Sequence, residues 1–167
     1  VIEAVTSVVE EVKGVHLLDV DPGADTNQTV STFIGDPEGV AEAAFRVVKR
    51  ASQLIDMSRH SGAHPRHGAT DVCPFVPVKG VTMEECVAIA RKVGRRIGEE
   101  LDIPVYLYED AAQQPGRRNL ADVRKGEYEA LQKKLADSQA AHKKDKEALT
   151  AKVDRLEKQL ATIRNAM

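Results

Sequence analysis

Two short apolar runs on either side of a turn-forming sequence constrain the fold of this chain most strongly. The first run, VHLLDVD, covers Val15 to Asp21, and the second, TVSTFIG, covers Thr29 to Gly35. Both runs are rich in β-branched and apolar residues, which favour strands, whereas the intervening PGADTNQ contains residues typical of turns. We therefore expect two strands joined by a polar loop.

Helical patterns occur before and after these two strands. Apolar residues recur at helical spacing over residues 1–12, in a pattern that lacks a helix start. A second helix is expected over residues 37–57, with a proline in its first turn, where a missing amide hydrogen costs nothing. A third is expected over residues 82–101, because Thr82 and Glu85 have the spacing of a capping box.

Two later segments, Val72 to Val78 and Ile103 to Asp110, are also expected to be strands. Pro74 and Pro77 lack amide donors, so the first of them should lie at a sheet edge or contain a bulge. If one strand preceded Val1, where we expect the natural start to be missing, the first six elements would have the split βαβ order of ferredoxin-like domains. We therefore predict an α+β fold, a ferredoxin-like two-layer sandwich with its helices on one face of the sheet.

The composition changes at about Tyr128, after which Gly and Pro are absent and Lys, Glu, Ala, Leu and Gln dominate. This change predicts one subdomain over residues 1–127 and a helical tail over residues 128–167. A heptad-like apolar seam begins at Leu149 and extends for about three heptads. We expect this seam to form a short coiled coil through which the chain forms a homo-oligomer.

Bulk composition points to a small-molecule partner. The chain has 167 residues, a net charge of -2 and two cysteines, and it contains no apolar stretch long enough to cross a bilayer. This charge provides no general attraction for nucleic acid or a membrane surface. Few cysteines and no secretory leader favour a cytoplasmic setting.

The segment SRHSGAHPRHGATD, residues 58–71, concentrates chemically active side chains and has no apolar period. His60, His64 and His67 could suggest a metal site, because neutral imidazoles are common ligands. Pro65, however, argues against a helix that would present them on one face. We therefore expect no metal and expect these groups to be solvated or hydrogen-bonded.

Two interpretations of this loop stay open. In the first, HPRHG is a polar turn in which Gly68 permits a positive φ and the histidines face water. In the second, an imidazole near neutral pKa, the Arg66 guanidinium and an orienting Asp71 carboxylate together serve proton transfer on an anionic substrate. Cys73, just after the loop, is expected to pack as a small apolar group.

Polar groups also gather at the end of the first expected strand. Asp19 and Asp21 should lie on the same side of that strand, and Asn27 and Thr29 follow as hydrogen-bonding groups. For any single member, such as Asp25 or Asn27, an Asx turn is an equally good explanation.

Several segments together resemble one known family. LLDVDPGADTNQTVSTFIG, LIDMSRHSGAHPRHGATDVCPFVPVKGVTMEECV, GEELDIPVYLYEDAA and RKGEYEALQKKL are similar, in order and spacing, to the amino-terminal subdomain of the glutamate formimidoyltransferase family. The resemblance covers Val1 to about Leu135, and its loop motif HPRxGxxDVCPF is specific.

The resemblance implies transfer of a formimidoyl group from N-formimidoyl-L-glutamate to tetrahydrofolate, a co-substrate, in histidine degradation. It implies His64 as the catalytic acid and base and Asp21 as a second catalytic group. Lys79 would add positive charge for glutamate carboxylates. The other positions implied around the substrate are Asn27, Thr29, Arg66 and Asp71.

The chain also departs from the family pattern. The strand expected ahead of Val1 is absent, His60 and His67 have no assigned role, and the sequence after EYEALQKKL does not continue into the family's folate-binding half. A transferase must hold donor and acceptor within reach of one another. The alternative hypothesis is therefore a non-catalytic, single-subdomain relative that serves as a ligand-binding or scaffold module.

Overall fold

A computed structural model describes residues 1–63, 66–126, 146, 149–150 and 152 of the chain. Two compact units are present, Val1–Arg124 and Lys125–Met167. The helices and strands below belong to the first, except for the last two residues of the helical segment 120–126. Most of the predicted tail, including nearly all of its heptad seam, lies outside the described residues. Within the described part of the chain, no helix is both long and apolar enough to span a membrane.

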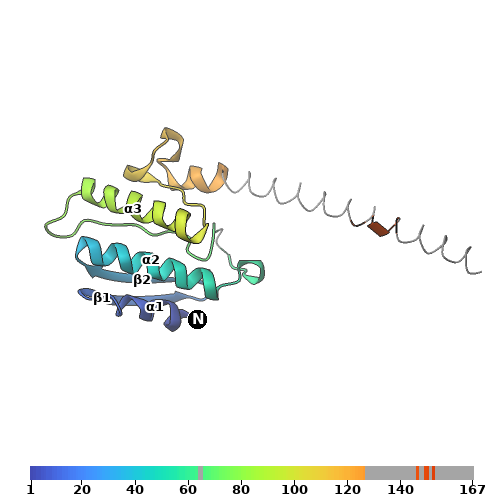
Figure 1. Cartoon of the computed structure of the whole chain (residues 1–167), viewed down its shortest axis with the longest axis horizontal. Helices are drawn as coiled ribbons and strands as arrows, with labels where there is room; N and C mark the ends of the chain where they lie inside the picture. Colours follow the sequence, from blue (N-terminus) through green and yellow to red (C-terminus); the bar gives the residue numbers. More distant parts are fainter. Residues whose placement is uncertain (64–65, 127–145, 147–148, 151, 153–167) are drawn as a thin grey trace, which may run out of the picture. The chain divides into compact units, whose positions relative to one another are not determined.

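The two predicted strands form an antiparallel hairpin. β1 spans Val15–Gly23 and β2 spans Gln28–Gly35, as Figure 1 shows. The pairing register shifts between Leu17 and Asp19, where β1 contains a bulge. The side chain of Leu17, opposite Phe33, belongs to the face packed beneath the helices. The strand prediction is confirmed to within two residues.

The helix predicted for residues 37–57 is α2, Pro37–Leu54. It begins where the Asp36 side chain accepts a hydrogen bond from the Gly39 amide at 2.9 Å, a typical N-cap that satisfies one of the otherwise unpaired amides. It ends three residues earlier than predicted, after which the chain becomes extended at Ile55.

The third predicted helix is confirmed as α3, Met83–Leu101, together with its capping box. The Thr82 amide donates to the Glu85 carboxylate at 2.7 Å, and the Glu85 amide donates to the Thr82 hydroxyl at 3.2 Å. The sequence spacing alone was sufficient here because both hydrogen bonds are local.

The first predicted helix is shorter than expected. Residues 1–12 form α1, Ile2–Thr6, followed by a 3-10 turn, η1, Ser7–Val9. Valine is β-branched and a weak helix former, and residues 1–12 contain five valines, so the helix does not extend through the pattern. The remaining helical elements are η2 (Met57–Arg59), η3 (Glu109–Ala111), η4 (Pro115–Arg117) and residues 120–126.

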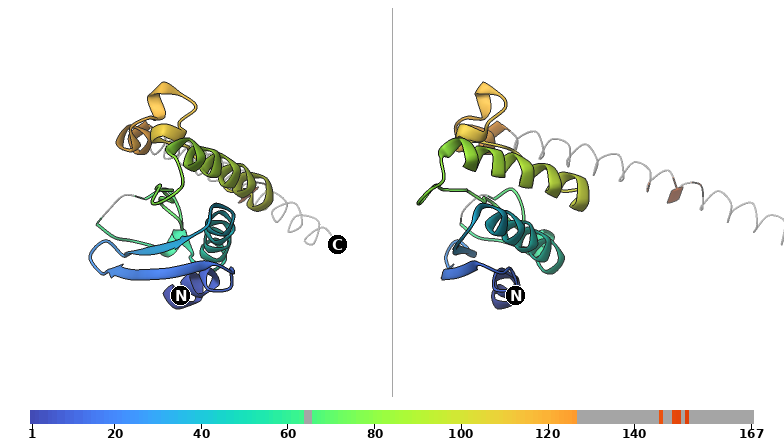
Figure 2. Two further views of the ribbon diagram at one scale, coloured as in Figure 1. Left: turned by 90° about the vertical axis from the view of Figure 1, so that its left-hand side faces the viewer. Right: turned by 60° about the vertical axis from the view of Figure 1, so that its left-hand side comes forward.

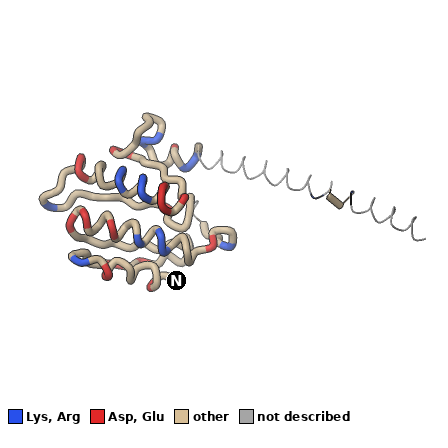
Figure 3. Tube along the Cα trace, viewed as in Figure 1, with Lys and Arg blue, Asp and Glu red and all other residues tan. Residues whose placement is uncertain are grey.

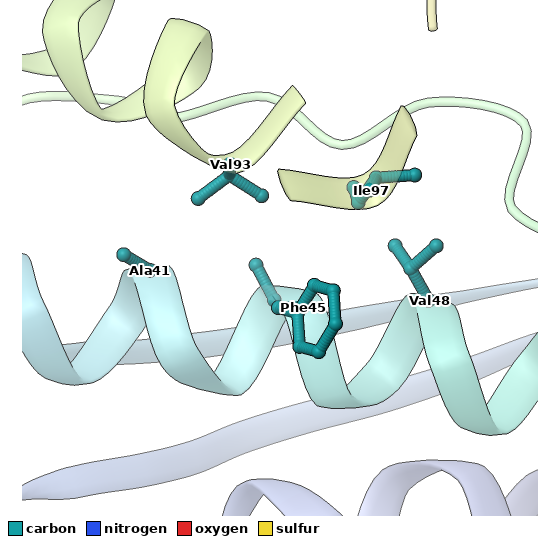
Figure 4. Packing of buried hydrophobic residues seen from close by; sticks show 6 residues of the cluster. Ala41, Phe45, Val48, Val93 and Ile97 are labelled. Carbon is teal, nitrogen blue, oxygen red and sulfur yellow. The ribbon is translucent and has the colours of Figure 1, made fainter. Parts of the chain in front are cut away.

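The helix α2 lies between the hairpin and α3 (Figure 2). Ala41 and Val48 on α2 face Val93 and Ile97 on α3 (Figure 4). On its other side, α2 buries Ala43 completely in a second cluster. This second cluster consists of Val9, Val12, Val15 and Ala43.

Both α2 and α3 carry acidic and basic positions (Figure 3), and some of these side chains form ion pairs within and between the two helices. Glu42 accepts hydrogen bonds from Arg46 at 2.7 Å and from Arg96 at 2.5 Å. The Arg96 guanidinium also lies 3.6 Å from the centroid of the Phe45 ring. The hydrogen bonds from Arg96 and Arg46 lower the pKa of Glu42 below its ordinary value of 4.5.

The strands predicted at residues 72–78 and 103–110 are not formed. Both segments are largely extended, but the described sheet contains only β1 and β2. Side chains of 72–78 still alternate in burial as in a strand, and Cys73 and Phe75 pack against the core cluster of α2 and α3. Burial of alternate side chains can thus hold a segment in place without a hydrogen-bonded neighbouring strand. Pro74 and Pro77 also lack amide donors, which reduces the number of hydrogen bonds that the segment could make in a sheet. The fold is therefore mixed α and β, with a two-stranded antiparallel sheet.

The packing makes a direct prediction for two valines. Val93 is 4% exposed in the core and Val78 is 75% exposed, so the same change to alanine should have different effects. Val93→Ala should lower the free energy of unfolding by about 2 kcal/mol, because two methyl groups leave a cavity. Val78→Ala should change it by less than about 0.5 kcal/mol. Urea denaturation of both variants measures this difference, and equal losses would contradict the packing.

Candidate functional site

The loop that follows α2 lies against the turn between β1 and β2. Asn27 in this turn adopts a left-handed conformation, with φ of 50°, which asparagine tolerates better than most residues. Its side-chain amide donates to the Ser61 carbonyl at 2.8 Å. The Asp25 carbonyl accepts from the Ala63 amide at 3.3 Å. The turn and the loop are therefore joined by backbone and side-chain hydrogen bonds.

The His60 ring makes two contacts with Asn27. Its Nε2 lies 2.9 Å from the Asn27 carbonyl oxygen, and its Nδ1 lies 3.5 Å from the Asn27 side-chain amide. Both contacts agree with a neutral ring protonated on Nε2, since a carbonyl only accepts and an amide nitrogen only donates. His60 therefore serves the structure of the loop.

Arg66 also bonds to the turn. Its Nη2 donates to the Thr26 carbonyl at 2.8 Å, and its Nη1 approaches the Asn27 carbonyl at 3.3 Å. Two of its N–H groups are thus directed at backbone carbonyls, whereas the sequence predicts a contact with a substrate carboxylate. We call this set the turn contact: His60, Ser61, Ala63 and Arg66 against residues 25–27.

The expected catalytic residue, His64, lies with Pro65 outside the described residues, so its role stays a prediction. The two residues that flank this pair in the sequence are both described. Ala63 bonds to Asp25 and Arg66 bonds to Thr26. The turn contact therefore includes residues both before and after His64 in the sequence.

A second polar cluster surrounds Asp71 at the end of the loop. Its Oδ1 accepts from the His67 amide at 3.1 Å, and its Oδ2 accepts from Gln28 at 3.4 Å and from Arg124 at 2.5 Å. The Asp71 and Arg124 side chains are 13% and 23% exposed. We call these four residues the Asp71 cluster. It joins the loop, β2 and the helical residues 120–126.

The His67 side chain is directed into the protein. Its ring centroid lies 6.0 Å from that of Tyr106, and its Nε2 is buried without a hydrogen-bond partner among the described residues. The Arg117 guanidinium lies 5.1 Å from the Tyr106 ring centroid. His67 therefore packs as part of the structure. Gly68, expected at a positive φ, does not have one.

Two ionisable groups near the Asp71 cluster are held neutral. Burial raises the pKa of the Cys73 thiol from its ordinary 9.0 to about 11. Burial also raises the pKa of Tyr108, with a smaller contribution from the Cys73 and Glu109 charges. A thiol with such a pKa is a poor nucleophile at neutral pH. The prediction that Cys73 packs as an apolar group is confirmed by its contact with the core.

The structure separates Asp21 from Thr29. Asp21 pairs with Val30 and Thr29 with Pro22, so the two side chains lie on opposite faces of the hairpin. Asp19, two positions before Asp21, shares its face, as predicted. Both aspartates are exposed. Asp21 is thus available to a ligand, but not to one that also contacts Thr29 from the same side.

The last candidate, Lys79, is exposed beyond the extended segment 72–78. It lies next to Gly80, whose φ is 72°. The structure brings Asn27 and Arg66 together in the turn contact, and it places Asp71 in a separate cluster. Among the described residues there is no group of three or more His, Cys, Asp or Glu side chains placed to hold a metal ion.

Comparison with known sequences decides the family. Residues 1–161 match the profile of the formiminotransferase domain, N-terminal subdomain. The chain belongs to the formiminotransferase family. It is 55% identical over 139 residues to the formimidoyltransferase-cyclodeaminase of Mus musculus, a match that covers 83% of the chain and 26% of the relative.

Other members of the formiminotransferase family, one of them shorter, also match the chain. The chain is 50% identical over 137 residues to the glutamate formimidoyltransferase of Streptococcus pyogenes serotype M1, covering 82% of the chain and 46% of the relative. A match to the Gallus gallus formimidoyltransferase-cyclodeaminase is 58% identical and covers 81% of the chain and 25% of the relative. The chain therefore spans about a quarter to a half of the length of these relatives.

Sequence reasoning missed two members of the Asp71 cluster, Gln28 and Arg124. Neither has a local pattern that indicates a role, because their partner is 43 and 53 residues away. One signal was present: Arg124 is the first residue of RKGEYEALQKKL, one of the segments that carried the resemblance to formiminotransferases.

The turn contact predicts a specific sensitivity at Gly62. A Cβ at this position would lie 2.3 Å from the Thr26 carbonyl oxygen, whereas at Gly116 it would meet no atom within 4 Å. Gly62→Ala should therefore lower the free energy of unfolding by about 1–3 kcal/mol. Gly116→Ala should change it by less than about 0.5 kcal/mol. Denaturation in urea compares the two variants, and a neutral Gly62→Ala would contradict the close approach of loop and turn.

The raised pKa of Cys73 predicts slow alkylation. With a pKa of about 11 in place of 9.0, the thiolate fraction at pH 8 falls by about 100-fold. Iodoacetamide should therefore modify Cys73 at least about 100-fold more slowly in the folded chain than in urea, and the rate should rise as the pH approaches 11. Peptide mass spectrometry measures the modification, with Cys73→Ser identifying the signal. Equal rates in the folded and unfolded chain would contradict burial of the thiol.

Proposed function

We propose that this chain is the amino-terminal part of a formiminotransferase that transfers a formimidoyl group from N-formimidoyl-L-glutamate to tetrahydrofolate in histidine degradation. The observation that carries the proposal is the family match over residues 1–161 together with the intact loop sequence HPRHGATDVC. Relatives named glutamate formimidoyltransferase and formimidoyltransferase-cyclodeaminase support it.

In the proposed reaction, His64 acts as general acid and base. A nitrogen of tetrahydrofolate forms a bond to the formimidoyl carbon, and the bond from that carbon to the glutamate nitrogen breaks. One proton must leave the attacking nitrogen and one must reach the departing nitrogen. An imidazole can accept and return a proton near pH 7, so a single histidine can serve both steps.

The described residues support a polar surface for this chemistry. Asp21 is exposed at the end of β1, where we propose that its carboxylate takes part in proton transfer. Lys79 is exposed as well, and its ammonium group suits the carboxylates of the donor. Asn27, Thr29, Arg66 and Asp71 stay in the proposed site, although Asn27 and Arg66 also form hydrogen bonds between the turn and the loop.

We propose that the full sheet is ferredoxin-like. Phe33 of β2 and Phe75 of segment 72–78 pack against the same core cluster, which supports a common layer for the two segments. In a split βαβ fold, the first strand lies between the third and the last strand of the sheet. Such a strand, paired with β2 and 72–78, would supply the hydrogen bonds that the extended segment lacks here.

We also propose a cytoplasmic location and self-association through the tail. Cys73 and Cys86 are free thiols, which agrees with a reducing compartment. Self-association rests on the heptad-like pattern from Leu149, most of which lies outside the described residues.

The central test of the proposed function is His64→Ala in a full-length protein that contains this chain. Transfer is followed as formation of formimino- or methenyl-tetrahydrofolate from N-formimidoyl-L-glutamate. We expect kcat to fall by at least about 100-fold, the usual contribution of a general acid and base. The matched control is His16→Ala, which removes an exposed imidazole from β1 and should leave kcat unchanged.

Unchanged transfer by the His64→Ala variant would remove His64 from the mechanism. The same assay on the isolated chain separates the two functional hypotheses, because measurable turnover by residues 1–167 would exclude a non-catalytic module.

A further inference from the structure

The Asp71 cluster fixes one end of the loop that contains His64. Residues 60–63 and 66–71 have no regular helix or strand, so side-chain anchors must define the backbone there. The turn contact supplies one anchor through Ala63 and Arg66. Asp71 supplies the other, because its carboxylate accepts from the His67 amide within the loop.

The Asp71 carboxylate depends on the guanidinium of Arg124. The Asp71 side chain is 13% exposed and the Arg124 side chain is 23% exposed, and Oδ2 of Asp71 lies 2.5 Å from Nη2 of Arg124. A carboxylate that is largely removed from water is strongly destabilised when its cationic partner is lost. Gln28 adds a longer hydrogen bond of 3.4 Å, which does not replace the charge. The conformation of residues 67–71 is therefore coupled to the position of Arg124.

We propose that Asp71 and Arg124 are positioning residues, whose ion pair holds the loop in the geometry that transfer requires. This inference rests on the proposed function and deepens it. It assigns Asp71 to the support of the loop, in place of the substrate contact expected from the sequence. It also gives Arg124 a role that no local sequence pattern indicates. Displacement of a reacting group by about 1 Å can lower a rate by about 100-fold, so a loosened loop should be visible in kcat.

The experiment uses Asp71→Asn, Arg124→Gln and the double variant. Asp71→Asn keeps the side-chain oxygen that accepts from His67 and removes the charge that pairs with Arg124. The matched control is Asp110→Asn, which removes the same kind of carboxylate from an exposed pair with Arg118 at 3.2 Å.

The first measurement is amide hydrogen exchange of the chain itself, which does not depend on catalysis. We expect exchange in residues 66–71 to accelerate by about tenfold or more in Asp71→Asn and Arg124→Gln. The exchange rates of amides in α2 and α3 should stay unchanged in these variants. In the Asp110→Asn control, the exchange rates of residues 66–71 should also match those of the wild type. Wild-type exchange in this segment of Asp71→Asn would overturn the inference, whether or not the protein transfers a formimidoyl group.

The second measurement is steady-state transfer by the full-length protein that contains the chain. We expect kcat to fall about 10- to 100-fold in each single variant, with KM for N-formimidoyl-L-glutamate changing less than about threefold. The double variant should be no slower than the slower single variant, because both changes break one interaction. A raised KM with unchanged kcat would overturn the positioning role and indicate substrate contact, as would additive losses in the double variant.

The two measurements separate failure of the inference from failure of the proposed function. A full-length wild-type protein that transfers no formimidoyl group overturns the proposed function, and with it the catalytic purpose of the ion pair. Accelerated exchange with wild-type kcat leaves the proposed function in place and overturns only the positioning role.

Discussion

The first unit depends on α2 burying two of its sides at once. One side packs Ala43, fully buried, against Val9 and Val15, and the other packs Phe45 and Val48 against α3. Small side chains at positions 41, 43 and 44 let neighbouring elements approach the helix closely. Because α2 supplies buried residues to both clusters, and Phe33 of β2 packs against both, the hairpin and α3 keep their relative position mainly through α2. Apart from Arg124, which follows α3, the described residues of the candidate site belong to these elements or to the loops between them.

Much of this framework could be predicted from the sequence, because its signals are local. The strand runs at Val15 and Thr29, the proline at the start of α2 and the capping box at Thr82 each depend on neighbours a few residues away. The same reasoning was wrong at residues 72–78 and 103–110. Residues 72–78 do alternate in burial, but pairing in a sheet requires a second strand at the right distance, and no local pattern contains that information.

The sequence predicted which types of side chain the candidate site contains, but only partly which groups those side chains contact. The loop around HPRHG was identified because it combines imidazole, guanidinium and carboxylate groups without an apolar period. The structure gives several of these groups contacts within the protein: His60 and Arg66 bond to the turn, and His67 packs near Tyr106. A sequence lists the functional groups of a loop, but their orientation depends on elements that are distant in the chain. For this reason a loop with many reactive side chain types can use as many of them for structural contacts as for reaction.

The long separation between Asp71 and Arg124 has a consequence for how the protein is made. The two residues are 53 positions apart, and a chain is synthesised from its amino terminus at a limited rate, so earlier parts can fold first. The hairpin and α2 can pack as soon as they leave the ribosome, as can the contact between the loop and the turn. The Asp71 carboxylate, however, cannot form its ion pair until Arg124 has emerged from the ribosome. During synthesis, therefore, the loop is the last part of the first unit to reach its final bonding, and a ribosome that stalls before that point would release a folded core without a finished site.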